Sequence, residues 1–392
     1  MNYKTLLLFI FFSLLSITSY ANVVFPKWDD DGDGFKTQSY TVSKGGKLDV
    51  SLGSGNIHIK AWNKDEVFVK VSGLDDEDMH RVKIKQNGNT IRVEYHNNWG
   101  SWSGNNDIDV TASIPNQFDI DIETSGGDIQ IEDGLQGTLK GTTSGGNVKI
   151  GDVGGTVDME TSGGYIYTGD IKGDITLNTS GGDIHLGSVS GEAEVNTSGG
   201  DIRVTKIQKG LKAKTAGGEI IIGDCGADVT LATFGGDVRV AKVMGKAILS
   251  SAGGDIVLRG STNAVKAKTA DGDILLEDIA GPVDAKTAAG EISAELVQVK
   301  GQCKLATASG DVHLFVPEEA KATINARVVV RGWWKNRKDD NSIRSDFKTE
   351  SYDEDDDEHE IRAVYKLNGG GYVIDLQTAL GNIEIRKLKK YK

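Results

Sequence analysis

Thr179-Ser180-Gly181-Gly182-Asp183-Ile184 is the stretch that decides the fold of this 392-residue chain, because it returns eighteen residues later as Thr197-Ser198-Gly199-Gly200-Asp201-Ile202. The phrase starts at Thr124, Thr143, Thr161, Thr179, Thr197 and Thr215, and in looser form at Thr233, Ser251, Thr269, Thr287 and Thr307. The steps are one of nineteen residues, eight of eighteen and one of twenty. Each of these glycines would cost a helix about 1 kcal/mol, whereas a chain that turns tightly and stacks on itself uses them.

Between the turns, polarity alternates with a period of two, which is typical of β-strands. Val157, Met159 and Thr161 share one face, and Asp158 and Glu160 share the other. One coil has too few inward side chains for a core of its own, but stacking at ~4.8 Å per coil makes the core continuous. The sequence therefore predicts an all-β fold, a parallel β-solenoid (β-helix-like) of ~18-residue coils on the order of 50 Å long. Whether each coil has two or three sides stays open.

The ends of the chain depart from the repeat, as a solenoid requires if its open edges are not to aggregate. A hairpin is expected at Asn87-Gly88, inside a β-rich N-terminal module. The expected organisation is a signal peptide at 1–21, an acidic linker at 22–41, the N-terminal β module at 42–117, the solenoid repeats at 118–316, an excursion with an acidic run that acts as a C-terminal cap at 317–371, and a terminal coil with a basic tail at 372–392.

The start of the chain has the features of a secretory signal. Lys4 supplies a positive charge, residues 6–15 are apolar, and Ser19 and Ala21 are small residues at the −3 and −1 positions of a cleavage site. The apolar run is too short for a good membrane span. We expect export through a cleaved signal peptide to the periplasm or to the cell surface and extracellular space. The net charge of −13 argues against nucleic acid as a partner.

Three groups of residues toward the two ends of the chain carry a resemblance. They are residues 45–50 with Gly55-Asn56-Ile57, Ile114-Pro115 leading into residues 124–129, and residues 370–374 with Gly381-Asn382-Ile383. In these segments the chain resembles the putative-adhesin β-strand-repeat family of unknown function, the DUF4097 type, which is related to head-GIN domains. The resemblance covers nearly all of the chain after the signal peptide. It implies an adhesin-like protein and, because some family members are linked with cell-envelope stress responses, a second role in sensing.

An acidic column follows the Gly-Gly turns and raises the question of calcium between coils. Its members are Asp128, Asp183, Asp201, Glu219, Asp237, Asp255, Asp273, Glu291 and Asp311. The calcium-binding nonapeptide repeat needs Gly-Gly-x-Gly-x-Asp, whereas here the acid follows the glycines directly. Aspartate also forms turns by accepting hydrogen bonds from nearby backbone N–H groups. We therefore favour a structural role, and a melt with and without chelator tests it.

A second acidic feature has the spacing of the first half of a calcium loop. Asp29, Asp31 and Asp33 stand at ligand positions, with Gly34 at the sharp turn. Position twelve of this loop is Tyr40 rather than the usual bidentate glutamate. A solvated acidic linker is the favoured interpretation, so no metal and no cofactor are expected.

Two pairs of tryptophans are candidate ligand or partner contacts. Trp99 and Trp102 stand in a Gly/Ser/Asn-rich loop, and Trp333 and Trp334 stand among basic residues of the excursion. Aromatic side chains on loops are potential platforms for sugars or protein partners, or they cover the ends of the rod. An outward apolar stripe of Ile221, Val257 and Leu275 is a further candidate, for self-association.

Two polar columns are expected to be structural. Cys225 falls in the column of Val243, and Cys303 in that of Val283, so both are predicted to be buried thiols too far apart for a disulfide. The threonine column has the same parity as Val157 and Met159. A ladder at a corner of the core explains it better than ice binding does.

The regular steps also bear on catalysis. Polysaccharide enzymes built on β-helices need long loops to form a cleft, and eight successive eighteen-residue steps leave no room for them. We therefore expect a non-catalytic binding scaffold or adhesin that meets protein or glycan partners at the cell envelope. The alternatives are a component of envelope-stress sensing and, less favoured, a polysaccharide-active enzyme.

Overall fold

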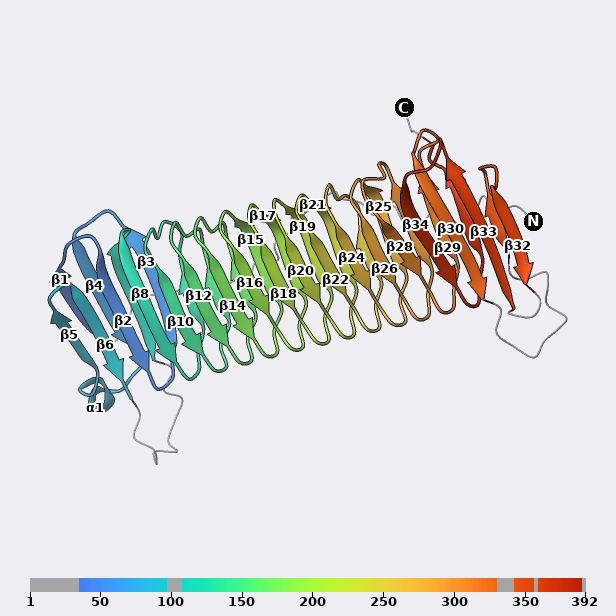
Figure 1. Ribbon diagram of the computed structural model, residues 1–392. Helices are drawn as coiled ribbons and strands as arrows, with labels where there is room; N and C mark the ends of the chain where they lie inside the picture. The colour runs from blue at the N-terminus through green and yellow to red at the C-terminus, as the bar shows by residue number, and fades with distance from the viewer. Residues whose placement is uncertain (1–34, 97–107, 330–341, 356–358, 390–392) are drawn as a thin grey trace.

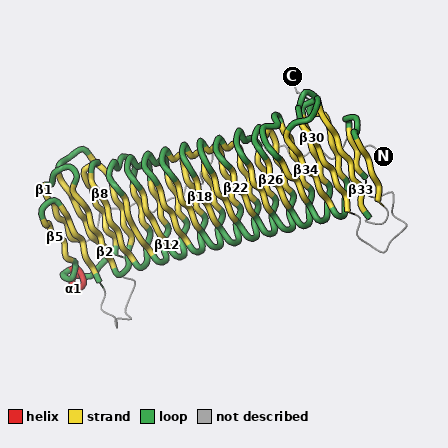
Figure 2. Tube along the Cα trace, in the orientation of Figure 1, coloured by secondary structure: helices red, strands yellow, loops and turns green. Residues whose placement is uncertain are grey.

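The protein is a long rod of stacked coils, described here by a computed structural model for residues 35–96, 108–329, 342–355 and 359–389 (Figure 1). Each coil of the repeat contributes one strand to each of two long parallel sheets, and the chain crosses between the sheets at the turns (Figure 2). The apolar core fills the space between the sheets along the rod. The predicted all-β solenoid is confirmed.

Sheet A has the spatial order β1 (Phe35–Thr41), β4 (Glu66–Ser72), β7 (Asp109–Pro115), β3 (Asn56–Trp62), β9 (Ile129–Ile131), β11 (Val148–Ile150), β13 (Ile166–Thr168), β15 (Ile184–Val189), β17 (Ile202–Ile207), β19 (Ile220–Cys225), β21 (Val238–Val243), β23 (Ile256–Leu258), β25 (Ile274–Ile279), β27 (Ile292–Leu296), β29 (Val312–Val316), β35 (Ile383–Lys387) and β31 (Ile343–Ser345).

Sheet B has the spatial order β5 (Lys83–Asn87), β6 (Thr90–Tyr95), β2 (Gly46–Leu52), β8 (Phe118–Thr124), β10 (Leu139–Thr143), β12 (Val157–Thr161), β14 (Ile175–Thr179), β16 (Ala193–Asn196), β18 (Leu211–Lys214), β20 (Val229–Ala232), β22 (Ala247–Ser250), β24 (Val265–Lys268), β26 (Val283–Lys286), β28 (Cys303–Ala306), β34 (Tyr372–Thr378), β30 (Ala322–Val329), β33 (Glu360–Leu367) and β32 (Ser351–Asp355). A single short helix, α1 (Asp76–Met79), is found among the described residues.

The alternation of each coil places its apolar side chains inside. In the coil formed by β14 and β15, the residues that face the core are Ile175, Leu177, Thr179, Ile184, Leu186 and Val189, and all of them are buried. Single bridges link Val153 to Ile171 and Ile171 to Val189 along the edge beyond sheet A. Each coil therefore has two broad sides and a narrow third edge, which resolves the question that the sequence left open.

The Gly-Gly turns bring the backbones of successive coils into contact. A Cβ atom on Gly146 would overlap the carbonyl oxygen of Gly127 in the preceding coil, whereas one on Gly145 would meet nothing within 4 Å. The first glycine of this turn thus points to solvent, and the second is required by the stacking distance.

The buried threonines hydrogen-bond to their own turn and to the turn of the preceding coil. Thr197 Oγ1 donates to the carbonyl of Gly182 at 2.9 Å and accepts from the N–H of Gly200 at 3.3 Å. The same pair of bonds recurs at Thr161, Thr179 and Thr215. The predicted corner ladder is confirmed.

Both cysteines are free thiols and are buried, as predicted. Cys225 pairs in register with Val243, and Cys303 lies at the start of β28 over the core. Burial raises the pKa of each thiol, which keeps both in the unreactive protonated form.

The two ends continue the same sheets by a different route. At the N-terminal end, the coil made of β2 and β3 lies between β6 and β7 on one side and β8 and β9 on the other. At the C-terminal end, the coil made of β34 and β35 lies between β28 and β29 on one side and β30 and β31 on the other. The hairpin expected at Asn87-Gly88 is the β5–β6 turn, with Gly88 at a φ of 58°. Residues 35–41, expected in the linker, instead form β1, because they pair with β4.

Candidate functional site

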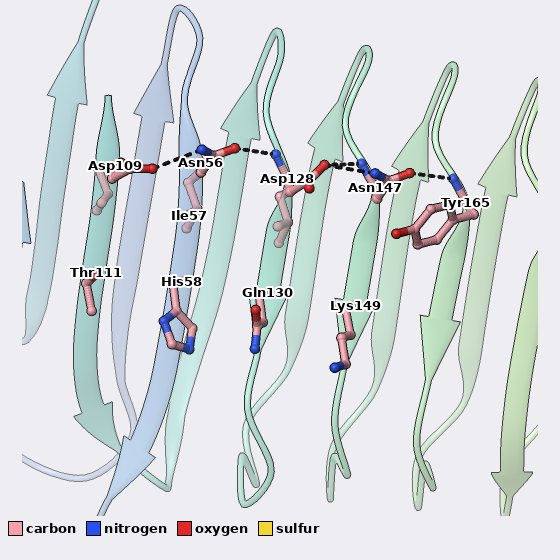
Figure 3. Close-up of a pocket in the computed structure, with 12 residues that line it drawn as sticks. Asn56, Ile57, His58, Asp109, Thr111, Asp128, Gln130, Asn147, Lys149 and Tyr165 are labelled. Atoms are coloured by element: carbon pink, nitrogen blue, oxygen red, sulfur yellow. Dashed lines mark hydrogen bonds between the residues drawn. The ribbon is translucent and has the colours of Figure 1, made fainter. Parts of the chain in front are cut away.

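The outer face of sheet A carries a shallow depression of about 160 Å³ where β7, β3, β9, β11 and β13 lie side by side (Figure 3). Strand register sets its side chains in two rows, since alternate residues of each strand point outward. The first row is Asp109, Asn56, Asp128, Asn147 and Tyr165, and the second is Thr111, His58, Gln130, Lys149 and Tyr167.

The first row is a continuous hydrogen-bonded chain. Asn56 Nδ2 donates to Asp109 Oδ1 at 2.9 Å, and Asn56 Oδ1 accepts from the N–H of Asp128 at 2.9 Å. Asp128 Oδ1 accepts from the N–H of Asn147 at 2.7 Å, and Asn147 Oδ1 accepts from the N–H of Tyr165 at 3.3 Å. These bonds fix the rim of the depression, as the dashed lines in Figure 3 show.

Tyr165 lines the depression, and two further aromatic rings continue from it along sheet A. Tyr165 and Tyr167 meet edge to face, with centroids 4.9 Å apart, and Tyr167 stacks on His185 of the next coil at 4.5 Å with the ring planes 19° apart. All three side chains are half-buried. Burial lowers the pKa of His185 below its usual 6.5, and the positive charge of Arg203 lowers it further, so the ring is neutral at pH 7. We call these three residues the aromatic row.

A charged group lies beside the second row. Glu132 accepts from His58 at 2.9 Å and from Lys60 at 3.5 Å. Its carboxylate is about one-third exposed, so this pair orients His58 more than it stabilises the fold.

The chemistry of this face favours a ligand that lies flat. The depression is smaller than the roughly 300–1,000 Å³ typical of sites that enclose a small molecule. It offers amides, a hydroxyl and a cation next to aromatic faces, a combination that suits a ring with hydroxyl edges. Among the residues that the structure describes, no three His, Cys, Asp or Glu side chains are grouped as metal ligands.

The acidic column has the structural role that we favoured. Asp201 Oδ1 accepts from the N–H of Glu219 at 2.8 Å, and Asp255 Oδ1 accepts from that of Asp273 at 2.8 Å. A second column does the same at the edge beyond sheet A, where Asp170 Oδ1 accepts from the N–H of Ser188 at 2.9 Å. Each of these aspartates thus satisfies a backbone donor of the following coil.

The other predicted site residues lie outside the described residues. They are Asp29, Asp31, Asp33, Trp99, Trp102, Trp333 and Trp334. The predicted self-association stripe of Ile221, Val257 and Leu275 does lie on the outer face of sheet A, with each side chain half-buried.

The aromatic row was missed at the level of sequence. Tyr165 was visible there only as a break in the acidic column. Writing the coils one above another would have placed Tyr167 and His185 in one column, next to Tyr165. This alignment of coils is the sequence signal that would have indicated a cluster of aromatic residues.

The fold and this face together define a class: a β-solenoid whose functional surface is an open sheet rather than a closed cavity. The chain belongs to the Toastrack DUF4097 family, whose model matches residues 46–223 and 226–386. No curated protein matches the chain. Among the described residues, no helix has the length and apolar character needed to cross a bilayer.

Solved structures that match the chain include two bacterial proteins described as putative adhesins. The one from Bacteroides fragilis is 17% identical, with 67% of this chain and 97% of that chain covered and a TM-score of 0.28. The one from Parabacteroides distasonis is 14% identical, with 68% and 98% covered and a TM-score of 0.28. A third, described as a putative lipid binding protein from P. distasonis, is 12% identical, with 91% and 97% covered and a TM-score of 0.20.

Proposed function

We propose that this protein is an exported, non-catalytic binding scaffold of the cell envelope, and that it holds a glycan on the outer face of sheet A. The observation that carries the proposal is the aromatic row beside a rim of fixed amides. Stacking of a sugar ring on Tyr165 would bury apolar C–H faces, while Asn147, Gln130 and Lys149 would meet its hydroxyls. Tyr167, whose ring is stacked on His185, would support Tyr165 from the side.

The regular coils support a binding role over a catalytic one. Strands in the central coils are joined by short turns, so that no wall rises on either side of the outer face of sheet A there. A flat platform of this kind suits repeated contacts along a polymer, where several weak sites add through multivalency.

Affinity electrophoresis tests the proposed glycan site directly. Gels are cast with one purified polysaccharide each, such as a xylan, a mannan or solubilised peptidoglycan. We expect Y165A/Y167A to lose the retardation that the wild-type chain shows in at least one gel, because the ring that lines the depression and the ring that supports it are both gone. Phe234→Ala is the matched control: it removes an aromatic ring that is 72% exposed on a turn far from the depression. Equal retardation of Y165A/Y167A and wild type in every gel would reject the site.

Location separates the two envelope roles. Adhesion requires exposure on the cell surface, so an external protease added to intact cells should degrade the protein. Complete protection until the envelope is opened would place it in the periplasm, and would favour the sensing role over direct adhesion.

A further inference from the structure

The outer face of sheet B is divided lengthwise by charge. From β8 to β16 its exposed outward residues include the carboxylates of Asp119, Glu123, Asp158, Glu160 and Glu194. From β18 to β28 they include the ammonium groups of Lys212, Lys214, Lys266, Lys268 and Lys304. We call these the acidic half and the basic half.

The ten side chains of the two halves are available to a partner, except that one oxygen of Asp119 accepts from the N–H of Thr138 at 2.8 Å. All are exposed, and none forms an ion pair with another residue in the described parts of the chain. The other charged residues on these strands alter the division into an acidic and a basic half only slightly. Asp121 already pairs with Lys47 at 2.8 Å, and Asp284 already pairs with Lys286 at 2.7 Å. Lys140, in β10, is the one cation within the acidic half.

We propose that this face binds a second copy of the same chain, with the acidic half of one rod against the basic half of the other. An antiparallel pair related by a two-fold axis brings both halves into opposite-charge contact at once. In such a pair the acidic half of each copy contacts the basic half of the other.

A second copy fits this face better than an anionic polymer does. A polymer long enough to follow the rod would meet the lysines and then be repelled by the acidic half. A second copy instead offers lysines where the acids lie, and acids where the lysines lie.

The area of the face is sufficient for a stable pair. Stacking at ~4.8 Å per coil and strands of four to five residues give a surface roughly 50 Å long and about 15 Å wide from β8 to β28. Two copies would bury about 1,500 Å² in total, which falls within the usual range of roughly 1,200–2,000 Å² for specific interfaces. Exposed charges dominate this face, so association should weaken as salt shortens the screening length.

Sedimentation of the full chain with charge-reversed variants tests the proposal. We expect wild type to be dimeric in about 0.02 M salt and to dissociate toward monomer in about 0.5 M salt. K266E/K268E and D158K/E160K should each raise the dimer dissociation constant at least about tenfold. K206E/K242E, which changes the net charge as much as K266E/K268E but on exposed lysines near the ends of β17 and β21 in sheet A, should behave as wild type.

Mixing the two variants provides the decisive arm. K266E/K268E places acids in the basic half, and D158K/E160K places lysines at the positions that face them in the two-fold pair. An equal mixture should therefore form heterodimers although neither variant pairs well with itself. A monomeric wild type in low salt, a dimer that neither variant weakens, or an equal loss in K206E/K242E would overturn the proposal. Retention of a monomeric wild type on heparin, lost in K266E/K268E, would overturn it in favour of an anionic partner. Thermal melts of each variant confirm that the rod is folded.

Discussion

The middle of the rod and its two ends use the same coil but connect it differently. From β8 to β29 the coils lie in space in the order in which they occur in the chain. At each end one coil is inserted out of order, β2–β3 at one and β34–β35 at the other. At the N-terminal end the inserted coil comes first in the chain, then the outer strands β6 and β7, and then β8 on its other side. At the C-terminal end the outer strands β30 and β31 come first, and β34 and β35 then pair between them and the last regular coil. At both ends the inserted coil therefore has neighbours that are distant in the sequence.

The residue that follows the turn differs between the regular coils and the inserted coils. In the middle an aspartate suffices, because it only has to accept from the following coil, as Asp255 does from Asp273. The inserted coils carry Asn56 and Asn382 at the same position. Asn382 accepts from the N–H of Ser342 at 2.9 Å, while its own N–H donates to Asp311 at 2.7 Å and its amide approaches Asp311 at 3.3 Å. An amide side chain can accept from one neighbouring coil and donate to a carboxylate of the other. A carboxylate in its place would only accept, and it would be repelled by the neighbouring carboxylate.

The largest expected effect comes from removing one end. A chain that stops at residue 317 lacks β30 to β35, and it exposes the backbone edges of β28 and β29 with the core beneath them. We expect it to aggregate, since open sheet edges pair with other chains. Light scattering and gel filtration of the soluble fraction provide the measurement.

Deleting a coil from the middle is the matched control for that truncation. Removal of residues 220–237 takes out one coil of eighteen residues, β19 and β20, and joins Glu219 to Val238, which is the register partner of Ile220. The shortened rod should stay monomeric under high salt and lose less than about 5 °C in Tm, because each coil contacts only its neighbours. If the two deletions behave alike, the ends have no special role.

The second effect concerns stacking itself, which the middle and the ends share. Gly146→Ala should cost about 3 kcal/mol, because the added methyl group overlaps the carbonyl of Gly127. Gly381→Ala should cost as much, since its methyl group overlaps the carbonyl of Gly310, although that residue is far away in sequence. Urea unfolding measures both losses. Gly145→Ala, with open space around the new atom, should change stability by less than about 0.5 kcal/mol, and a large loss there would contradict the stacking argument.

The third effect separates the middle from the ends. Asn382→Asp places a second carboxylate beside Asp311 and should destabilise the C-terminal cap by about 1–2 kcal/mol. Asp255→Asn in the middle keeps its acceptor oxygen and removes one charge from an acidic column, so it should be neutral or slightly stabilising. Hydrogen exchange of β34 and β35 should rise in the first variant and stay unchanged in the second. Equal exchange in both would show that the amide is not needed at the inserted coil.

The sequence predicted the coil but not the order of coils at the ends. The period of eighteen and the alternation of Val157, Met159 and Thr161 follow from local chemistry, so they could be recognised directly. The phrase around Asn56 was equally visible as a coil. Its neighbours, however, are chosen by contacts with Asp109 and Asp128, and no local period encodes pairings over such separations.

The candidate site shows the same limit. Taken singly, Tyr165, Tyr167 and His185 are ordinary outward residues of a strand. Whether they form a site depends on which residue lies beside each of them in the neighbouring coil. Only the register brings Tyr167 over His185 and places Tyr165 at the end of the amide rim. The residues that stood out in the sequence, the tryptophans and the Asp29 run, were conspicuous by composition rather than by position in the stack.

The smallest expected effect is a pH dependence that belongs to the middle of the rod. Burial and Arg203 hold the pKa of His185 below its unfolded value of about 6.5, so the folded chain binds fewer protons than the unfolded chain just below that pH. The stabilisation is therefore present above pH 6.5 and is lost as the pH falls toward the folded pKa. Tm values of wild type and His185→Gln between pH 5 and 8 should converge, or cross, on the acid side. A pH-independent difference between His185→Gln and wild type would mean that burial does not lower the pKa of this ring, and would weaken the aromatic row as a preformed platform.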